Sequence, residues 1–400
     1  MKVAVLRETF PGERRVALVP SLLPLLAKQG WQAVVETDAG ASAGFPDSAY
    51  QEKGAEIAPN RAAAIDGADA ILQVRTLGAN LDAGRGDLDL FRPGQVVIGL
   101  CDPLGQPQAV KELAERRVTL FALEMIPRIT RAQSMDVLSS MATIAGYKAV
   151  LLAANELPRL FPMLMTAAGT ITPAKVLVIG AGVAGLQAIA TSRRLGAVVQ
   201  AFDVRAAVKE QIESLGAKFV ELKLGAANAE DKGGYAKELT AEQQQRQREQ
   251  LADVVAGCDV VITTAAIPGR PSPLLVTADA VRRMAPGSVI VDLAAERGGN
   301  CELTRADETV VENGVTILGP TNLASEAPYH ASQMFAKNVA TLLQLLTQKG
   351  ELVIDLKDEV IRETLVAKDS QVQNPRLREM LDLGPLLQPP EPAPINHLAT

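Results

Sequence analysis

The residues best suited to bind a ligand lie in a glycine-rich stretch near the middle of the chain. Gly180, Gly182 and Gly185 have G-x-G-x-x-G spacing, and Asp203 follows about twenty residues later. In this pattern the first glycine permits a tight turn, the second lets a pyrophosphate approach the backbone, and the third lets a helix pack closely on a strand. The pattern therefore predicts a dinucleotide-binding site.

The segments around these glycines predict the elements that such a site needs. Residues 175–179 form a short apolar run typical of a buried parallel strand, residues 183–195 have helical apolar spacing, and residues 197–202 predict the next strand. A helix that begins directly after the glycines presents free N–H groups and a positive dipole end to a phosphate. Asp203 can accept hydrogen bonds from the adenosine ribose, and its charge would repel a 2′-phosphate. The acid therefore favours NAD over NADP.

A second group of polar side chains lies around the start of a helix that we predict from about Asp136 to about Leu157. Its members are Arg128, Arg131, Gln133, Asp136 and Ser139. Gln133 and Asp136 could orient a nicotinamide carboxamide, and Arg128 could hold a phosphate or ribose in a crevice between domains. Alternatively, Ser134 or Asp136 caps the helix and the arginines face solvent. Spacing alone does not choose between these interpretations.

Two further groups of charged residues could take part in chemistry. Arg14 and Arg15, beside Glu13, could bind a substrate carboxylate, although a solvated loop explains them equally simply. Asp292 and Glu296 follow a predicted strand and could form an acid–base pair, while Asp292 could instead accept hydrogen bonds from a ribose or from its own loop.

The composition excludes several classes of function. A net charge of −6 provides no basic surface for nucleic acid. Three widely separated cysteines lack metal-ligand spacing, so we expect no metal site and a reducing compartment. We find no apolar run long enough for a membrane helix and expect no direct membrane insertion. His330 and His397 are the two histidines, so a mechanism that needs a histidine acid or base has little to draw on.

Strands and helices alternate on both sides of the glycine-rich stretch. With 400 residues, the chain is long enough for two or three domains. We predict an α/β fold with two Rossmann-like domains, parallel sheets, long connecting helices and a nucleotide crevice between the domains. A long helix predicted near residues 325–346 would return the chain to the first domain. The predicted bounds are 1–137 with 326–380 for the first domain, 138–325 for the nucleotide domain, and 381–400 for a proline-rich tail.

Residues 223–250 interrupt this alternation with a polar, glutamine-rich segment. An insertion of this length between strands predicts a mobile loop over the site. A solvated helix with a flexible lead-in is a compatible alternative.

Four stretches of the chain resemble one known family. They are PRITRAQSMDVLSS, GAGVAGLQAIATSRRLGAVVQAFDVR, GGYAKEL and TTAAIPGRP. Together they resemble the soluble NAD(H)-binding component of proton-translocating NAD(P) transhydrogenases, and the resemblance extends from the first loop to the helix near residue 345. It implies a homodimer with membrane and NADP(H)-binding partner subunits, in the cytoplasm at the inner face of the membrane.

The resemblance also implies roles for individual residues. The set placed at the nicotinamide end, and so at the reaction, is Arg128, Gln133, Asp136 and Ser139. The full set implied to contact the nucleotide is Arg128, Ile129, Thr130, Gln133, Asp136, Gly180, Ala181, Gly182, Val183, Gly185, Asp203, Val204, Arg205, Gly234, Tyr235, Gln247 and Ala266. Gly234 and Tyr235 would close over the site as the tip of the mobile loop. Ala266 stands where the family often has a bulkier residue.

In this family hydride passes directly between two nicotinamide rings. Such a transfer needs alignment of the rings rather than an acid or base, which agrees with the scarcity of histidine. NADH would be bound here and NADP⁺ on the partner component, while proton translocation would occur in membrane subunits.

Two alternative functions remain open at this stage. In an alanine dehydrogenase, Arg15 and Arg75 would stand at the positions of the substrate arginine and lysine. However, the catalytic histidine of that enzyme should fall near Leu100 or Cys101, where this chain has none. A non-catalytic NAD-sensing module would bind the nucleotide without transferring hydride.

Overall fold

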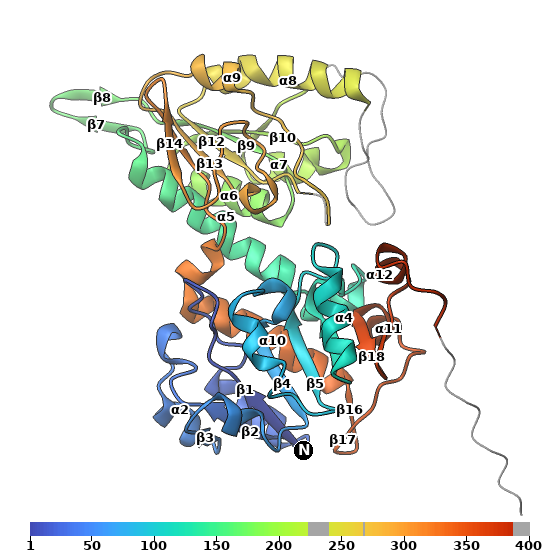
Figure 1. Ribbon diagram of the computed structural model, residues 1–400. Coiled ribbons are helices and arrows are strands. Elements are labelled where there is room, and N and C mark those ends of the chain that lie inside the picture. Colours follow the sequence, from blue (N-terminus) through green and yellow to red (C-terminus); the bar gives the residue numbers. More distant parts are fainter. Residues whose placement is uncertain (223–239, 267–268, 387–400) are drawn as a thin grey trace, which may run out of the picture.

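The computed structural model describes residues 1–222, 240–266 and 269–386 of the chain. Two α/β domains lie one above the other in Figure 1, and the long helix α5 (Val137–Glu156) joins them. A second long helix, α10 (Pro328–Leu345), packs against α5 and belongs to the first domain. The predicted fold class, two Rossmann-like domains with mainly parallel sheets joined by long helices, is confirmed.

The first domain is built on an eight-stranded sheet with the order β19-β18-β6-β5-β4-β1-β2-β3. Strands β1 to β6 are parallel, and β18 joins β6 in the antiparallel direction after the chain has returned from the second domain. The strands are β1 (Lys2–Val5), β2 (Gln32–Glu36), β3 (Glu56–Ala58), β4 (Ala70–Arg75), β5 (Val96–Leu100), β6 (Thr119–Ala122), β18 (Leu365–Lys368) and β19 (Gln371–Val372). The helices of this domain besides α10 are α1 (Leu23–Ala27), α2 (Asp47–Gln51), α3 (Arg61–Ile65), α4 (Pro107–Glu115), α11 (Glu359–Thr364) and α12 (Pro375–Met380).

The second domain is built on a seven-stranded sheet with the order β11-β10-β9-β12-β13-β15-β14. Counted from β9, and leaving aside the antiparallel edge strand β14, this is the 3-2-1-4-5-6 order of a dinucleotide-binding fold. The strands are β9 (Lys175–Ile179), β10 (Val198–Phe202), β11 (Lys218–Phe219), β12 (Val260–Thr263), β13 (Val289–Asp292), β14 (Thr309–Glu312) and β15 (Val315–Leu318). The helices are α6 (Val183–Arg194), α7 (Lys209–Ser214), α8 (Ala241–Ala256) and α9 (Ala278–Arg282). The topological switch point, where such sheets bind ligands, lies between β9 and β12.

Helix α5 belongs to both domain cores. Met141 and Ile144 pack in a core of the first domain, while Ala149, Val150 and Ala153 pack in a core of the second. The sequence-based expectation that no segment could span a membrane missed this helix: α5 has 20 residues and a mean hydropathy of 1.5, which satisfies the length and composition of a membrane span. In the structure, that apolar content supports the junction of the two domains, because a helix packed on two cores is apolar on more than one side.

Two small antiparallel ribbons add to the main sheets. One consists of β16 (Thr347–Gln348) and β17 (Glu351–Leu352) after α10. The other, which the sequence did not lead us to predict, is the hairpin of β7 (Leu164–Thr166) and β8 (Gly169–Ile171) that extends from the second domain in Figure 1.

Two predicted irregular segments contain ordered structure. Residues 241–250, predicted as part of the mobile loop, form the first part of α8, because Thr240 and Gln243 make a capping box at its start. This agrees with the alternative of a solvated helix. Residues 381–386, predicted as part of the proline-rich tail, are also described, and Leu381 and Leu383 pack against a core of the first domain.

Candidate functional site

The glycine turn after β9 has the conformation that its sequence predicts. Gly180 has φ +97°, a left-handed conformation that favours glycine. A Cβ at Gly185 would lie 1.8 Å from the carbonyl oxygen of Gly180, so the close approach of α6 to the turn requires glycine there. Gly182 is the N-cap of α6 and has no side-chain cap, and a Cβ built on it would meet no atom within 4 Å. The start of α6 is therefore open to an anion.

Asp203 stands at the end of β10 beside this turn. Its side chain is 8% exposed, and its Oδ2 accepts a 2.7 Å hydrogen bond from the backbone N–H of Ala181. The Arg205 guanidinium donates two hydrogen bonds of 2.9 Å to the same carboxylate, and the Arg205 backbone N–H donates another of 2.9 Å. The acid thus connects the phosphate-binding turn to Arg205.

The polar loop before α5 forms a pocket of about 200 Å³. Its lining residues are Pro127, Arg128, Ile129, Gln133, Asp136 and Ser139. Asp136 is also the N-cap of α5, because its carboxylate accepts hydrogen bonds from the Ser139 N–H at 2.9 Å and from the Ser139 hydroxyl at 2.6 Å. Helix capping and a place in the pocket are therefore both properties of Asp136 and do not exclude each other.

Other residues of this loop hold it in place. Arg131 points away from the pocket-lining set and pairs with Asp358, the N-cap of α11, through hydrogen bonds of 2.9 and 2.8 Å. Asn338 of α10 donates a 2.8 Å hydrogen bond to the backbone oxygen of Ser134. These contacts join the loop to segments more than 200 residues away in sequence, so its spacing alone could not reveal them.

Helix α5 determines how far this pocket lies from the glycine turn. At Gly146 the helix meets α6 so closely that a Cβ would lie 2.1 Å from the carbonyl oxygen of Ala184, in the first turn of α6. Ser139 precedes Gly146 by seven residues, a rise of about 10 Å along a helix. The pocket and the open start of α6 are thus separated by roughly the length of one nucleoside.

The remaining residues implied to contact the nucleotide have mixed surroundings. Thr130 is exposed at the start of the polar loop, and Val204 packs partly against a core of the second domain. Gln247 is buried on α8, and its Nε2 has no hydrogen-bond partner among the described residues. Ala266 is exposed after β12, near the switch point. Gly234 and Tyr235 lie outside the described residues.

The two domains touch beside the site. Asp102, after β5 of the first domain, pairs with Arg297 of the second domain. Leu104 of the first domain lies so close to Gly269 of the second that a Cβ there would be 2.8 Å from the Cβ of Leu104. Glu124, after β6, accepts a 2.8 Å hydrogen bond from the Asp102 N–H. Burial, reinforced by the charge of Asp102, raises the pKa of Glu124 to about 7.

The charged groups at the ends of β1 and β4 are paired with one another. The Glu13 carboxylate is bound by Arg15 at 2.6 Å and by Arg75 at 3.1 Å. Burial alone would raise the pKa of Glu13, but the hydrogen bonds and charges of the two arginines lower it to about 2. Glu8 accepts backbone N–H groups of residues 74 and 75, and burial together with the charge of Glu13 raises its pKa to about 8. In this structure, both arginines that could bind a substrate carboxylate are thus paired with an internal one.

Asp292 has a loop-supporting role rather than one in an acid–base pair. Its buried carboxylate accepts hydrogen bonds from Thr263, Thr304 and the backbone N–H groups of residues 294, 300 and 301. Five donors hold it in the loop after β13, as in the loop-capping alternative. His330 is exposed at the start of α10 and makes an edge contact with Tyr329, while His397 lies outside the described residues.

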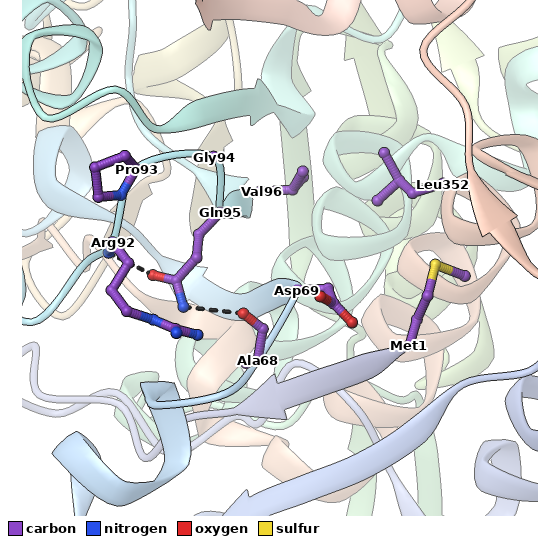
Figure 2. A pocket seen from close by; sticks show the side chains of 9 residues that line it. All are labelled: Met1, Ala68, Asp69, Arg92, Pro93, Gly94, Gln95, Val96 and Leu352. Carbon is purple, nitrogen blue, oxygen red and sulfur yellow. Dashed lines mark hydrogen bonds between the residues drawn. The ribbon is translucent and has the colours of Figure 1, made fainter.

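A larger open pocket of about 400 Å³ lies at the amino ends of β1, β4 and β5, around Asp69, Arg92 and Gln95 (Figure 2). The Gln95 amide donates to the backbone oxygens of residues 65 and 68 and accepts the Arg92 N–H, and Asp69 accepts the Lys2 N–H. These polar groups join strand starts to loops. Ligands of open parallel sheets bind at the opposite, carboxyl ends. Among the described residues, no group of three or more His, Cys, Asp or Glu side chains could hold a metal ion.

Comparison with known proteins decides the family. The alanine dehydrogenase/PNT N-terminal domain model matches residues 4–145, and the C-terminal domain model of the same family matches residues 149–375. The chain is 46% identical over 380 residues to the first of the separate chains of the NAD(P) transhydrogenase alpha subunit of Rhodospirillum rubrum, with 94% of this chain and 99% of the relative covered. This chain belongs to the NAD(P) transhydrogenase alpha-subunit family.

The structural comparison agrees with this family. The crystal structure of transhydrogenase from Sinorhizobium meliloti matches with a TM-score of 0.83 and 44% identity, covering 93% of this chain and 100% of that one. Alanine dehydrogenase 2 of Staphylococcus aureus is 29% identical over 361 residues, covering 88% of each chain. The resemblance in the RAQSMD and glycine-rich stretches is thereby confirmed. Family membership indicates a transhydrogenase-type oxidoreductase that works with nicotinamide nucleotides and with partner subunits.

Proposed function

We propose that this chain is the NAD(H)-binding component of a proton-pumping transhydrogenase. It would take part in direct hydride transfer between NADH bound here and NADP⁺ bound on a partner component, coupled to proton translocation by membrane subunits. The observation that carries this proposal is the placement of two complementary sites on one helix. The open start of α6 and the polar pocket before α5 are about 10 Å apart along α5.

The residues at the two ends fit the two ends of a dinucleotide. The glycine turn from Gly180 to Val183 leaves space and free N–H groups for a pyrophosphate, and a Cβ at Gly182 would occupy that space. Asp203, Val204 and Arg205 lie beyond the turn at the end of β10, where the adenosine ribose would lie. The gap at Gly182 is the structural feature that a bound nucleotide would use.

At the other end, four polar side chains would hold and align the nicotinamide. Gln133 and Asp136 supply amide and carboxylate groups suited to a carboxamide, and Ser139 is oriented by its hydrogen bonds to Asp136. Arg128 supplies a positive charge at the exposed rim of the pocket. When bound, the nucleotide supplies the hydride, and the task of these residues is to orient and shield the ring. The proposed contact set is completed by Ile129, Thr130, Gly234, Tyr235, Gln247 and Ala266.

An amino-acid dehydrogenase is the second candidate function, and the structure does not favour it. Arg15 and Arg75 bind Glu13, so both cations that would hold a substrate carboxylate are paired internally. Cys101 stands after β5 where a base would be needed, and burial raises its pKa well above the ordinary value. A buried neutral thiol is a poor general base. A non-catalytic NAD-sensing module is the third candidate, and it differs from the first in transferring no hydride to a partner.

We further propose that the chain forms a homodimer and works in the cytoplasm, at the inner face of the membrane, through its partner subunits. The hairpin β7–β8 supports the dimer. Met163, Met165 and Ile171 on it are 56%, 77% and 42% exposed. A two-stranded hairpin is only marginally stable alone, and a gathering of exposed apolar side chains indicates a contact surface. A second copy of this chain would cover it.

The assay that tests the function combines this chain with the NADP(H)-binding component. Hydride transfer from NADH to an NADP⁺ analogue is expected when both proteins are present, and no transfer with either alone. NADH formation from alanine and NAD⁺ by the purified chain would overturn the proposal. NADH binding without transfer to any partner would favour the sensing module instead.

Substitution of Gln133 tests the alignment role directly. Gln133→Asn keeps the amide but withdraws it by one methylene, so we expect hydride transfer to slow by about 100-fold, as for a misplacement of about 1 Å, with little change in the Kd for NADH. Stopped-flow kinetics and calorimetric titration measure the two quantities. Ser134→Ala, on an exposed side chain of the same loop, is the matched control and should change neither. Equal losses in rate and affinity for Gln133→Asn would argue against alignment.

A further inference from the structure

The carboxylate of Asp203 is fully used in this structure. Oδ1 accepts the backbone N–H and the Nε–H of Arg205, both at 2.9 Å. Oδ2 accepts the Ala181 N–H at 2.7 Å and the Nη2–H of Arg205 at 2.9 Å. A carboxylate offers about four lone-pair sites, two on each oxygen. All of them are occupied here, so a ribose hydroxyl can donate to Asp203 only if one of these donors leaves.

Of these donors, the Arg205 guanidinium is the one that can leave. The two backbone N–H groups belong to the glycine turn and to the end of β10, and their loss would distort both. A guanidinium on a flexible stem can rotate away without moving the backbone. A ribose hydroxyl and the Arg205 side chain therefore compete for the same oxygens.

The same pairing changes the electrostatics of the ribose site. The side chains of Arg205 and Asp203 are 16% and 6% exposed, so solvent screens the pair only weakly. An unpaired acid at this position would repel a 2′-phosphate, but a carboxylate held in a bidentate ion pair presents almost no net charge. A guanidinium released from the acid would also remain within two residues of it, as a cation suited to a phosphate.

We propose that Arg205 sets the nucleotide specificity of this site, by occupying and neutralising the acid that would otherwise select NAD(H). The inference rests on the proposed NAD(H) site and goes beyond it. Asp203 is the residue that touches the ribose, and Arg205 is a positioning residue that acts through Asp203. The site consequently discriminates between NADH and NADPH less strongly than Asp203 alone would.

The test is the ratio of the Kd for NADPH to the Kd for NADH, measured by fluorescence titration of the full chain. Arg205→Met retains the apolar stem but removes the competitor and its charge. We expect tighter NADH binding, weaker NADPH binding and a ratio at least about tenfold higher, the size of one lost charge-assisted hydrogen bond. Arg205→Lys, which keeps the charge without the bidentate fork, should give an intermediate ratio.

Asp203→Asn provides the opposite change. It releases Arg205 for a 2′-phosphate, so NADPH binding should strengthen and the ratio should fall below that of the wild type. The double variant with Arg205→Met should lose this gain, because the two residues act as a pair. Lys209→Met is the matched control: it removes a cation of the same domain that pairs with Glu221 and not with Asp203, and should leave the ratio unchanged.

The outcomes distinguish a failure of the Arg205 role from a failure of the proposed function. NADH binding by the wild type, with a ratio that stays constant or falls in Arg205→Met, would overturn the role of Arg205 and leave the proposed function intact. If Arg205→Met proves unstable in thermal melts, the Arg205→Lys and Asp203→Asn ratios still decide, because they are expected to change in opposite directions. An absence of NADH binding by the wild type would refute the proposed function and this inference together.

Discussion

The carboxyl ends of the two sheets are similar in architecture but different in how they use polar groups. In the first domain, Glu8, Glu13 and Glu124 are held within the protein, by arginines or by backbone N–H groups. In the second domain, the turn from Gly180 to Val183 leaves backbone N–H groups open at the start of α6. Both edges could in principle have bound a ligand.

The difference teaches that an α/β edge becomes a binding site by leaving groups unpaired, and a structural junction by pairing them. The first edge satisfies its charges internally and contacts the second domain through Asp102 and Arg297. It therefore supports the position of the second edge rather than adding a site of its own. Substitutions on each edge test this contrast, and their expected effects range from a large loss of stability to a small change in pH dependence.

The largest effect should come from breaking the charge pairing of the first edge. Glu13→Gln removes the negative charge between Arg15 and Arg75 and leaves buried cations without compensation. We expect a loss of about 3–5 kcal/mol in the free energy of unfolding, measured by urea denaturation at pH 7. Glu112→Gln breaks a more exposed pair with Arg85 and should have no resolvable effect. If the two variants lose the same stability, the first edge is not a closed ion-paired junction.

A smaller effect, on binding alone, should come from filling the open turn of the second edge. A methyl group at Gly182 meets no protein atom, so Gly182→Ala should melt at the wild-type temperature. It would stand where a pyrophosphate approaches the backbone, and we expect the Kd for NADH to rise by about 30- to 100-fold, as for an overpacked site. Gly86→Ala, also in open space but in the first domain, is the control. Unchanged NADH affinity in Gly182→Ala would remove the turn from the proposed site.

The smallest effect concerns pH, through Glu124 of the first edge. Burial raises the pKa of Glu124 to about 7, from an ordinary value of 4.5, so the folded protein holds a proton that the unfolded chain releases. Its contribution to stability is complete below about pH 4.5 and is lost as pH rises toward 7, by on the order of 2 kcal/mol. Glu124→Gln should flatten this slope in melts between pH 5 and 7.5, because its amide needs no proton, whereas the exposed Glu115→Gln should not. An unchanged slope in Glu124→Gln would mean that Glu124 is ionised in the folded state.

Residue patterns were sufficient for the parts of the site that depend on local backbone geometry. The spacing of Gly180, Gly182 and Gly185 predicts the turn, because a left-handed φ and a 1.8 Å contact each require glycine. The position of Asp136 predicts the start of α5, because a carboxylate at the N-cap accepts free N–H groups of the first turn.

Residue patterns failed where long-range packing decides the role of a residue. The apolar content of α5 did not reveal that it serves two cores, and the hairpin β7–β8 has no sequence signal strong enough to separate it from a loop. The spacing of Glu13 and Arg15 suggested a surface site for a carboxylate. The pairing with Arg75, 62 residues further along, makes that group structural instead.

The sequence by itself determined that the second domain carries a dinucleotide fold and that the chain has transhydrogenase relatives. Glycine spacing, the acid at the end of a strand and the RAQSMD loop are local features, and local geometry restricts which residues can occupy them. The tertiary structure alone decided which charges are available to a ligand. Whether Arg15, Arg75, Asp203 or Arg205 meets solvent or a partner depends on segments that folding brings together, and burial then determines how strongly each pair interacts.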